Sequence, residues 1–179
     1  FCCCSTEVDN KKFIKNTNSI SKVNIPVFNE DSAYFFIQKQ VDFGPRFLSS
    51  PGWAKCSAFL ENKLKTYTEN VIVQKASTKT YDNKNHTLKN IIASFSPEKN
   101  NRIVLMAHWD TRPIADYDTI NQNQPILGAN DGGSGVAVLL ELARIFCLQK
   151  PNIGIDLILF DAEDYGQPEN SKYPIMQNS

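Results

Sequence analysis

Three short stretches of the sequence carry side chains that can hold a metal ion or move protons. Residues 108–110 (His-Trp-Asp) follow one apolar run, and residues 161–164 (Asp-Ala-Glu-Asp) follow another. Between them, residues 128–135 (Gly-Ala-Asn-Asp-Gly-Gly-Ser-Gly) place an acidic residue inside a glycine-rich turn. Imidazole nitrogens and carboxylate oxygens are ligands of zinc, and a carboxylate beside a bound metal can transfer protons. The pattern indicates metal-assisted chemistry, provided that the fold brings the three stretches together.

Each of these side chains also has a simpler interpretation. Asp131 precedes an apolar run and could cap a helix, and His108 could be a core histidine. Glu163 and Asp164 could form a solvated acidic turn. The glycines around Asp131 favour a functional role, because they cost backbone entropy and allow the backbone to approach another group closely. His108 and Asp110 lie two residues apart, a spacing that lets a carboxylate orient an imidazole beside a metal.

The secondary structure around these stretches follows from apolar periodicity and capping residues. We expect helices over 32–41, 51–67 and 134–148, and strands over 71–76, 88–95, 103–107 and 155–160. The first helix would be capped by Asn29 or Asp31, and the second by Ser49 or Ser50.

The connections between these elements are also informative. The polar turn at 81–85 makes the first two strands an antiparallel hairpin at a sheet edge. The run 103–107 is continuously apolar, as in a strand buried on both faces. The helix over 134–148 is apolar almost all round and is expected to be covered on both sides. The polar loop 111–127 is long enough to indicate a functional or mobile segment.

The order strand, loop, buried helix, strand predicts a crossover connection in an α/β fold, with a mixed central β-sheet flanked by helices. Ligands of such sheets bind beyond the carboxyl ends of the strands. His108 and Asp164 follow two of these ends, and Asp131 lies at the start of the crossover helix. We therefore expect all three at one edge of the sheet.

Length and composition limit the classes of function. The chain has 179 residues, a formal net charge of zero and 41% hydrophobic residues, which suits one domain with a substantial core. No charge excess favours nucleic acid, and no apolar run approaches the roughly 20 residues of a membrane span. We divide the chain into a tether at 1–28 and a domain at 29–179, which we expect to be the N-terminal part of a single catalytic domain.

The first residues, Phe-Cys-Cys-Cys-Ser, and the polar stretch after them resemble the end of a bacterial lipoprotein signal. The alternatives are a stray cysteine cluster or a metal site, although adjacent cysteines lack the usual spacing of zinc ligands. We expect a location in the cell envelope or periplasm, with membrane contact only through a lipid anchor near Cys2–Cys4. Cys56 and Cys147 lie in apolar helical patterns and are expected to be buried thiols.

Four motifs together resemble the zinc-dependent exopeptidase fold that the M28 aminopeptidases share with the animal-type glutaminyl cyclases. They are Val-Asp-Phe-Gly-Pro-Arg at 41–46, His-Trp-Asp-Thr-Arg-Pro at 108–113, Gly-Ala-Asn-Asp-Gly at 128–132 and Phe-Asp-Ala-Glu-Asp-Tyr-Gly at 160–166. The resemblance runs from about Tyr34 to Gly166, and within it the motifs look most like bacterial members of the cyclase branch.

This resemblance implies one zinc ion held by Asp131, Asp164 and a histidine that we expect beyond residue 179. Asp164 stands where the animal cyclases have glutamate, so the metal or the local backbone must shift to suit the shorter side chain. His108 is similar to a ligand of the second zinc in dinuclear aminopeptidases, whereas the equivalent histidine of cyclases generally binds no metal. His108 and Asp110 would thus bind a second metal or orient groups around the first. Glu163 stands at the position of the residue that acts as general acid and base in this family.

The implied function is a zinc-dependent glutaminyl-peptide cyclotransferase, which converts the N-terminal glutamine of peptides and proteins to pyroglutamate and releases ammonia. A dinuclear M28 aminopeptidase is the first alternative, because the same carboxylate can activate water. An inactive binding protein of the cell envelope with this fold is the second. The expected partners are peptides with N-terminal glutamine, and the chain is expected to be a monomer. Trp109 or the loop 111–127 is a candidate for lining the substrate pocket.

Overall fold

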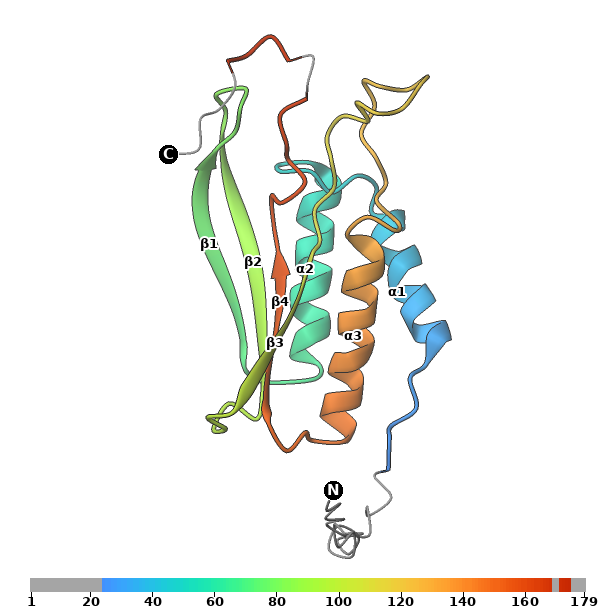
Figure 1. Cartoon of the computed structure of the whole chain (residues 1–179), viewed down its shortest axis with the longest axis vertical. Helices are drawn as coiled ribbons and strands as arrows, with labels where there is room; N and C mark the ends of the chain where they lie inside the picture. The colour runs from blue at the N-terminus through green and yellow to red at the C-terminus, as the bar shows by residue number, and fades with distance from the viewer. Residues whose placement is uncertain (1–23, 169–170, 175–179) are drawn as a thin grey trace, which may run out of the picture.

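The computed structural model describes residues 24–168 and 171–174. This part contains the helices α1 (Glu30–Asp42), α2 (Pro51–Lys65) and α3 (Gly133–Leu148), and the strands β1 (Val71–Lys79), β2 (Asn85–Phe95), β3 (Arg102–His108) and β4 (Gly154–Phe160). The helices lie beside one another against the sheet (Figure 1). Each helix and strand predicted from the sequence is confirmed, with ends that differ by a few residues.

Side-chain caps decide where the first two helices begin. The Asn29 side chain accepts a hydrogen bond from the Ser32 amide at 2.9 Å, so Asn29 rather than Asp31 caps α1. The Ser50 hydroxyl accepts from the Trp53 amide at 3.1 Å, and Pro51 occupies the first turn of α2. These bonds satisfy amide groups that have no partner inside the helix, and they decide between the two capping residues that the sequence offered for each helix.

The four strands form one mixed sheet in the order β1-β2-β4-β3. β1 and β2 are the predicted antiparallel hairpin at an edge, and β2 also pairs antiparallel with β4. β3 pairs parallel with β4, and α3 connects the two as the crossover helix. In this register His108 lies opposite Phe160, so both parallel strands end at the same edge of the sheet.

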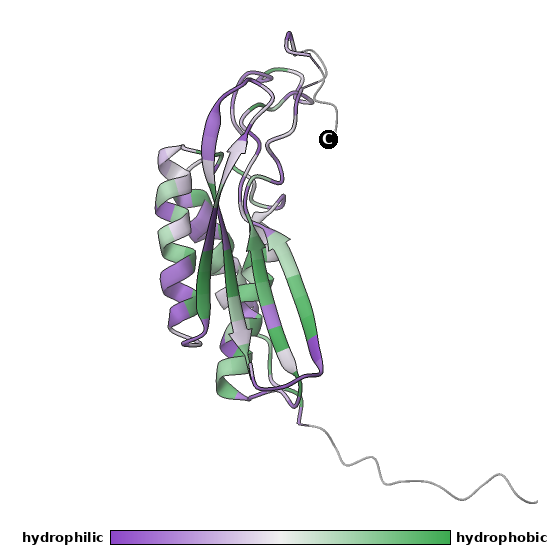
Figure 2. Cartoon of the chain, turned by 90° about the vertical axis from the view of Figure 1, so that its left-hand side faces the viewer, coloured by the Kyte–Doolittle hydropathy of each residue, from purple (hydrophilic) through white to green (hydrophobic). Residues whose placement is uncertain are grey.

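The core lies between one face of the sheet and the helices. The sheet contributes Ile91, Ala93, Leu157 and Leu159, and the helices contribute Leu60, Leu64, Val136 and Leu140, all of them fully buried. Each large aliphatic side chain buried here stabilises the fold by roughly 1.5–3 kcal/mol relative to an exposed position. Figure 2 shows the apolar character of the central strands along most of their length. α3 contacts α1, α2, β3 and β4, which confirms that it is covered on more than one side.

The prediction that residues 103–107 are buried on both faces is wrong for the described part of the chain. β3 is the last strand of the sheet order and pairs with β4 alone. Val104 and Met106 are 47% and 58% exposed, on the face opposite the helices. Among the described residues no further strand borders β3 and no helix covers this face. An apolar run shows which residues are present but not what packs against them.

The cysteine predictions have mixed outcomes. Cys56 is fully buried in α2, as expected. Cys147 is exposed, contrary to expectation, because it lies in the last turn of α3, next to the exposed Leu148. Cys2–Cys4 and most of the predicted tether at 1–28 lie outside the described residues, so the anchor and the domain boundary stay predictions. In the part of the chain that is described, no helix is both long and apolar enough to cross a membrane.

Candidate metal centre

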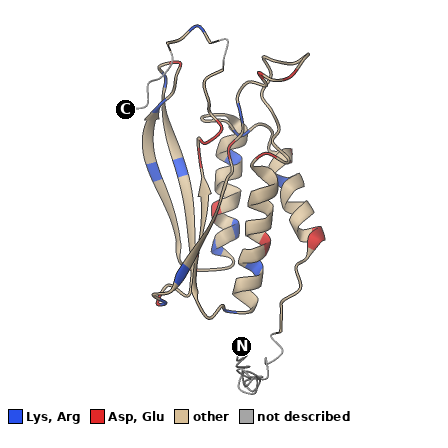
Figure 3. Ribbon diagram, in the orientation of Figure 1, with Lys and Arg blue, Asp and Glu red and all other residues tan. Residues whose placement is uncertain are grey.

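The three stretches singled out by their chemistry meet at one edge of the sheet. The Trp109 amide donates to the Phe160 carbonyl at 2.9 Å, which holds the chain after β3 against the end of β4. α3 begins at the same end, because Gly132, its N-cap, lies against His108 at the end of β3. Acidic residues gather there, after β3, after β4 and before α3 (Figure 3).

His108 lies among three carboxylates. Its Nε2 is 3.0 Å from Asp131 Oδ1, and its Nδ1 is 3.6 Å from Asp110 Oδ1 and 3.9 Å from Glu163 Oε2. The Asp110 carboxylate raises the pKa of His108 to about 9 against the opposing effect of burial, and Glu163 and Asp131 add to the rise. Nδ1 is buried and makes no hydrogen bond to the described residues. The imidazole therefore balances part of the negative charge of the cluster.

Asp110 positions the turn that carries the two adjacent acids. It is fully buried, and its two carboxylate oxygens accept from the amides of Glu163 at 3.2 Å and of Asp164 at 3.1 Å. Ala162, just before this pair, has φ +65°, a left-handed conformation that a non-glycine residue adopts only when surrounding contacts enforce it. The orienting role predicted for Asp110 is thus directed mainly at the backbone of residues 163 and 164.

The two adjacent acids have different environments. The Glu163 side chain is 65% exposed, whereas the Asp164 side chain is largely buried. Burial raises the pKa of Asp164 to about 6, and the carboxylates of Asp131 and Asp110 add to this rise. Asp164 Oδ2 is buried without a hydrogen-bond partner among the described residues. An accessible carboxylate for proton transfer and a buried oxygen that lacks a partner suit the separate roles predicted for these two residues.

The glycine-rich turn brings Asp131 to His108. Helix α3 has Gly132 as its N-cap, with no side-chain capping bond, so Asp131 is not the capping residue. Gly132 has φ +78°, and a Cβ there would lie 3.0 Å from His108 Cε1. Only glycine combines this conformation with such a close approach. The Asp131 side chain is 62% exposed and therefore open to a ligand.

The donor set fits a divalent cation such as zinc. Asp131 and Asp164 supply carboxylate oxygens, and the partnerless Oδ2 of Asp164 is an acceptor that a cation would satisfy. Across residues 24–168 and 171–174, however, no group of three or more His, Cys, Asp or Glu side chains has the arrangement of a complete metal site. The ligand roles of Asp131 and Asp164 therefore stay predictions.

Comparison with known proteins agrees with this chemistry. Residues 90–173 match the model of peptidase family M28. The structure is similar to that of Bacteroides thetaiotaomicron glutaminyl cyclase bound to N-acetylhistamine, with a TM-score of 0.81 and 47% sequence identity over 84% of this chain. The chain is similar in sequence to peptidase family M28 and in structure to a glutaminyl cyclase.

Other relatives of this group carry different descriptions. A leucine aminopeptidase precursor from Bacteroides thetaiotaomicron has a TM-score of 0.81 and 47% identity over 85% of this chain. Bovine glutaminyl-peptide cyclotransferase is 29% identical over 100 residues, or 49% of this chain. The chain spans about half of the two solved structures, 52% and 53%, and 27% of the bovine protein. The resemblance to M28 glutaminyl cyclases and the mixed α/β fold are confirmed.

Trp109, a candidate for lining the substrate pocket, is a core residue instead. Its side chain is fully buried and stacks on Trp53 with ring centroids 6.1 Å apart. Its Nε1 donates to the Lys89 carbonyl at 3.2 Å. The alternation of a strand continues past His108, so the next side chain points into the core while its neighbours reach the edge.

Arg112 and the tyrosines around the site were not identified from the sequence. Arg112, in the loop 111–127, forms two bonds to Asp116, at 2.6 and 2.7 Å, and its Nη1 lies 3.4 Å from the Asp164 carbonyl. Tyr81 and Tyr165 have ring centroids 6.1 Å apart and line a pocket of about 300 Å³ that also contacts Ala162. The position of Arg112 in the motif at 108–113 was the available signal, whereas nothing local to Tyr81 links it to the site.

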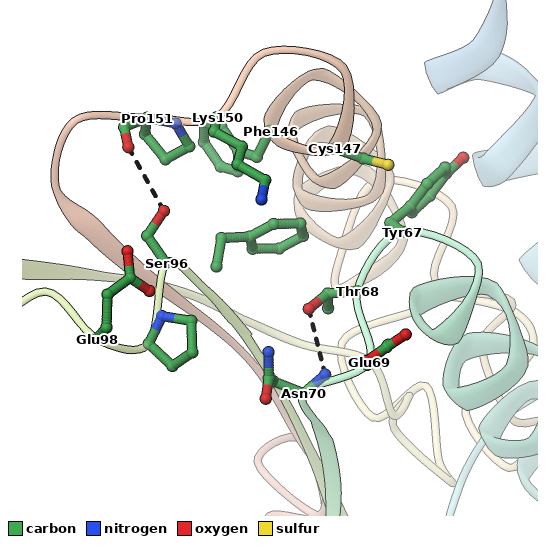
Figure 4. A pocket seen from close by; sticks show the side chains of 12 residues that line it. Tyr67, Thr68, Glu69, Asn70, Ser96, Glu98, Phe146, Cys147, Lys150 and Pro151 are labelled. Atoms are coloured by element: carbon green, nitrogen blue, oxygen red, sulfur yellow. Dashed lines mark hydrogen bonds between the residues drawn. The ribbon is translucent and has the colours of Figure 1, made fainter.

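A separate pocket of about 320 Å³ lies at the opposite end of the sheet (Figure 4). It lies between the last turn of α3, the start of β1 and the end of β2. Its lining includes Tyr67, Glu69, Phe95, Glu98 and Lys150. None of the predicted site residues lines it, so it plays no part in the candidate metal centre.

Proposed function

We propose that this chain contributes the zinc-binding and proton-transfer half of a glutaminyl-peptide cyclotransferase. The proposal is carried by the environment of Glu163. Its carboxylate is accessible, its backbone amide is held by Asp110, and the next residue, Asp164, has a buried oxygen without a hydrogen-bond partner among the described residues. The 47% sequence identity of the chain to a glutaminyl cyclase of the same fold supports the choice of reaction. The proposed substrate is a peptide or protein with an N-terminal glutamine.

Asp131 and Asp164 are the residues that would hold the zinc ion, which when bound supplies a Lewis acid for the γ-carbonyl of the substrate glutamine. Glu163 accepts a proton from the α-amine as the amine nitrogen bonds to Cδ, the carbon of the γ-carboxamide, and closes a five-membered ring. Glu163 then returns the proton to the departing amide nitrogen as the carbon–nitrogen bond breaks. The products are a pyroglutamyl peptide and one molecule of ammonia.

The charge of His108 supports this assignment. With a pKa raised to about 9, His108 carries a positive charge at neutral pH and faces Asp131 and Glu163. The imidazole therefore lies beside the carboxylate that accepts the first proton in this proposal, with its Nδ1 3.9 Å from Glu163 Oε2. Tyr81 and Tyr165 line a pocket that also contacts Ala162, the residue before Glu163, and are the side chains that we propose to contact the peptide substrate.

The reaction separates this proposal from its alternatives. The protein is incubated with a glutaminyl peptide and, separately, with an aminoacyl chromogenic substrate, while zinc is measured by elemental analysis. Ammonia release from the first and no cleavage of the second supports the cyclotransferase. Cleavage of the second with no ammonia from the first would refute it. Inactivity on both, without bound zinc, favours the binding protein.

An aminopeptidase is the second candidate. The match to peptidase family M28 and the similarity to a leucine aminopeptidase precursor favour it. In that reaction Glu163 would remove a proton from water rather than from the α-amine of the substrate. Two zinc ions per chain, one of them bound by His108, would favour this alternative, and a single ion would favour the cyclotransferase.

We also propose a location in the cell envelope for the protein. The support is the cysteine-containing start of the sequence and the polar stretch that follows it. Metabolic labelling with a radioactive fatty acid tests the anchor, because Cys2–Cys4 changed together to serine should abolish the label. Retained label in that variant would refute the assignment.

A further inference from the structure

Arg46 contacts both segments that carry the candidate metal centre. The residue is fully buried. Its Nε donates to the Trp109 carbonyl at 3.0 Å, its Nη1 to the Leu127 carbonyl at 2.8 Å and its Nη2 to the Gly128 carbonyl at 2.9 Å. Its own amide donates to the Thr111 hydroxyl at 2.8 Å. One side chain thus bonds to the backbone after β3 and to the backbone before α3.

The carbonyls that Arg46 binds lie next to the candidate ligands. Trp109 lies between His108 and Asp110. Leu127 and Gly128 open the glycine-rich turn that carries Asp131, and the Gly128 carbonyl also accepts from the first amide of α3 at 3.1 Å. The guanidinium therefore fixes the distance between the two backbone segments whose side chains meet at the 3.0 Å contact of His108 with Asp131.

The shape of the guanidinium is needed for this arrangement. The side-chain donors of Arg46 bond to backbone carbonyls rather than to a carboxylate, and these include the Gln40 carbonyl in α1 at 3.3 Å. Arginine presents planar donors in fixed directions, whereas the ammonium group of lysine is a compact charge on a flexible stem. Lysine at this position retains the charge but cannot join the carbonyls of these separate segments.

We propose that Arg46 is a positioning residue of the metal centre, which sets the separation of Asp131 from the His108–Asp110 segment before any metal binds. The inference rests on the proposed function in so far as the metal is zinc. Groups that orient metal ligands typically change metal affinity by about 10–100-fold when they are altered. We expect Arg46→Lys to weaken zinc binding by at least about tenfold.

The experiment compares two arginine-to-lysine variants in the complete protein. Zinc affinity is measured by competition with a chelating dye, and urea unfolding records the stability of each variant. Arg102→Lys is the matched control, because Arg102 bonds to the Asp156 carboxylate at 2.6 Å and to the Ser96 carbonyl at 2.8 Å, at the start of β3. We expect zinc affinity to fall in Arg46→Lys and to stay within about twofold in Arg102→Lys, even if both lose similar stability.

A readout without metal adds a second test. The Gly133 amide bonds to the Gly128 carbonyl, so its hydrogen exchange should be faster in Arg46→Lys than in wild type. If Arg46→Lys does not fold, Thr111→Val removes the hydroxyl that the Arg46 amide binds and should change both readouts in the same direction by less.

The outcomes separate the inference from the proposed function. Wild-type zinc affinity and unchanged exchange in Arg46→Lys would overturn the positioning role and leave the cyclotransferase proposal intact. Tighter zinc binding by Arg46→Met would also overturn the positioning role. That result would show that the main effect of Arg46 is repulsion between its positive charge and the zinc ion. A wild-type protein that binds no zinc contradicts the proposed function and the metal-positioning role together.

Discussion

Asp161 should make the protein less stable as the pH rises from about 4 to about 6. Its carboxylate accepts from Trp53 Nε1 at 2.8 Å, from the Lys89 amide at 2.7 Å and from the Ala162 amide at 2.9 Å. Burial nevertheless raises its pKa from 3.8 to about 6, partly offset by the bonds from Lys89 and Trp53, and the Asp110 carboxylate adds to the rise. The folded state therefore holds this proton more tightly than the unfolded chain does.

The magnitude follows from the shift in pKa. A difference of about two units corresponds to roughly 3 kcal/mol, at about 1.4 kcal/mol per unit. The contribution to stability is complete below the unfolded pKa of 3.8 and is lost as the pH rises through the folded pKa of about 6. Asp161→Asn cannot ionise, and its side-chain oxygen can still accept from Trp53 and Lys89, so its stability should lack this loss.

The assay is urea unfolding of wild type and Asp161→Asn across this pH range. The difference in unfolding free energy between them should change by roughly 3 kcal/mol in favour of the variant as the pH rises. Asp156→Asn is the control of opposite sign, because the Arg102 guanidinium lowers the pKa of Asp156 and its contribution is lost on acidification. Parallel stability curves for wild type and Asp161→Asn would refute the assignment.

Three further predictions concern the metal centre. Glu163→Gln should lower turnover by orders of magnitude while zinc stays bound, and steady-state kinetics with normal activity would exclude the acid–base role. Asp131→Ala should lose zinc, and full occupancy by elemental analysis would contradict the ligand role. Gly132→Ala should destabilise the fold by about 1–3 kcal/mol or more, since it combines positive φ with contact to His108. Gly44→Ala, with φ +82° and no atom within 4 Å of its Cβ, is the matched control for strain alone, and equal losses in thermal unfolding would disprove the contact.

Local signals in the sequence were sufficient for most of the fold. Asn29 and Ser50 precede apolar helical patterns, and their side chains make the capping bonds that such residues favour. The turn between β1 and β2 and the crossover through α3 followed from polar and apolar runs of ordinary length. The same rules placed His108, Asp131 and the acids after β4 at one edge, because strand ends and a helix start are positions fixed by topology.

Non-local contacts were not readable in the same way. The apolar residues of β3 indicate a buried strand, yet burial depends on which neighbours cover them, and the described sheet ends there. Trp109 is an aromatic residue beside the site and was a candidate for lining the pocket. Its ring instead stacks on Trp53, which lies 56 positions earlier in the sequence. Three of the carbonyls that Arg46 bonds to are 63 to 82 residues away. Backbone carbonyls carry no residue identity, so no sequence pattern could reveal these partners.

Because Asp110 accepts hydrogen bonds from two consecutive amides, substitutions near this site are expected to affect Glu163 and Asp164 together. Glu163 and Asp164 share one peptide unit, and a single buried carboxylate fixes the orientation of both residues. A rotation of that peptide that improves the reach of Asp164 toward a cation must also displace Glu163. Under the proposed roles of the two residues, metal affinity and proton transfer are coupled through this peptide, and a substitution that changes one is expected to change the other.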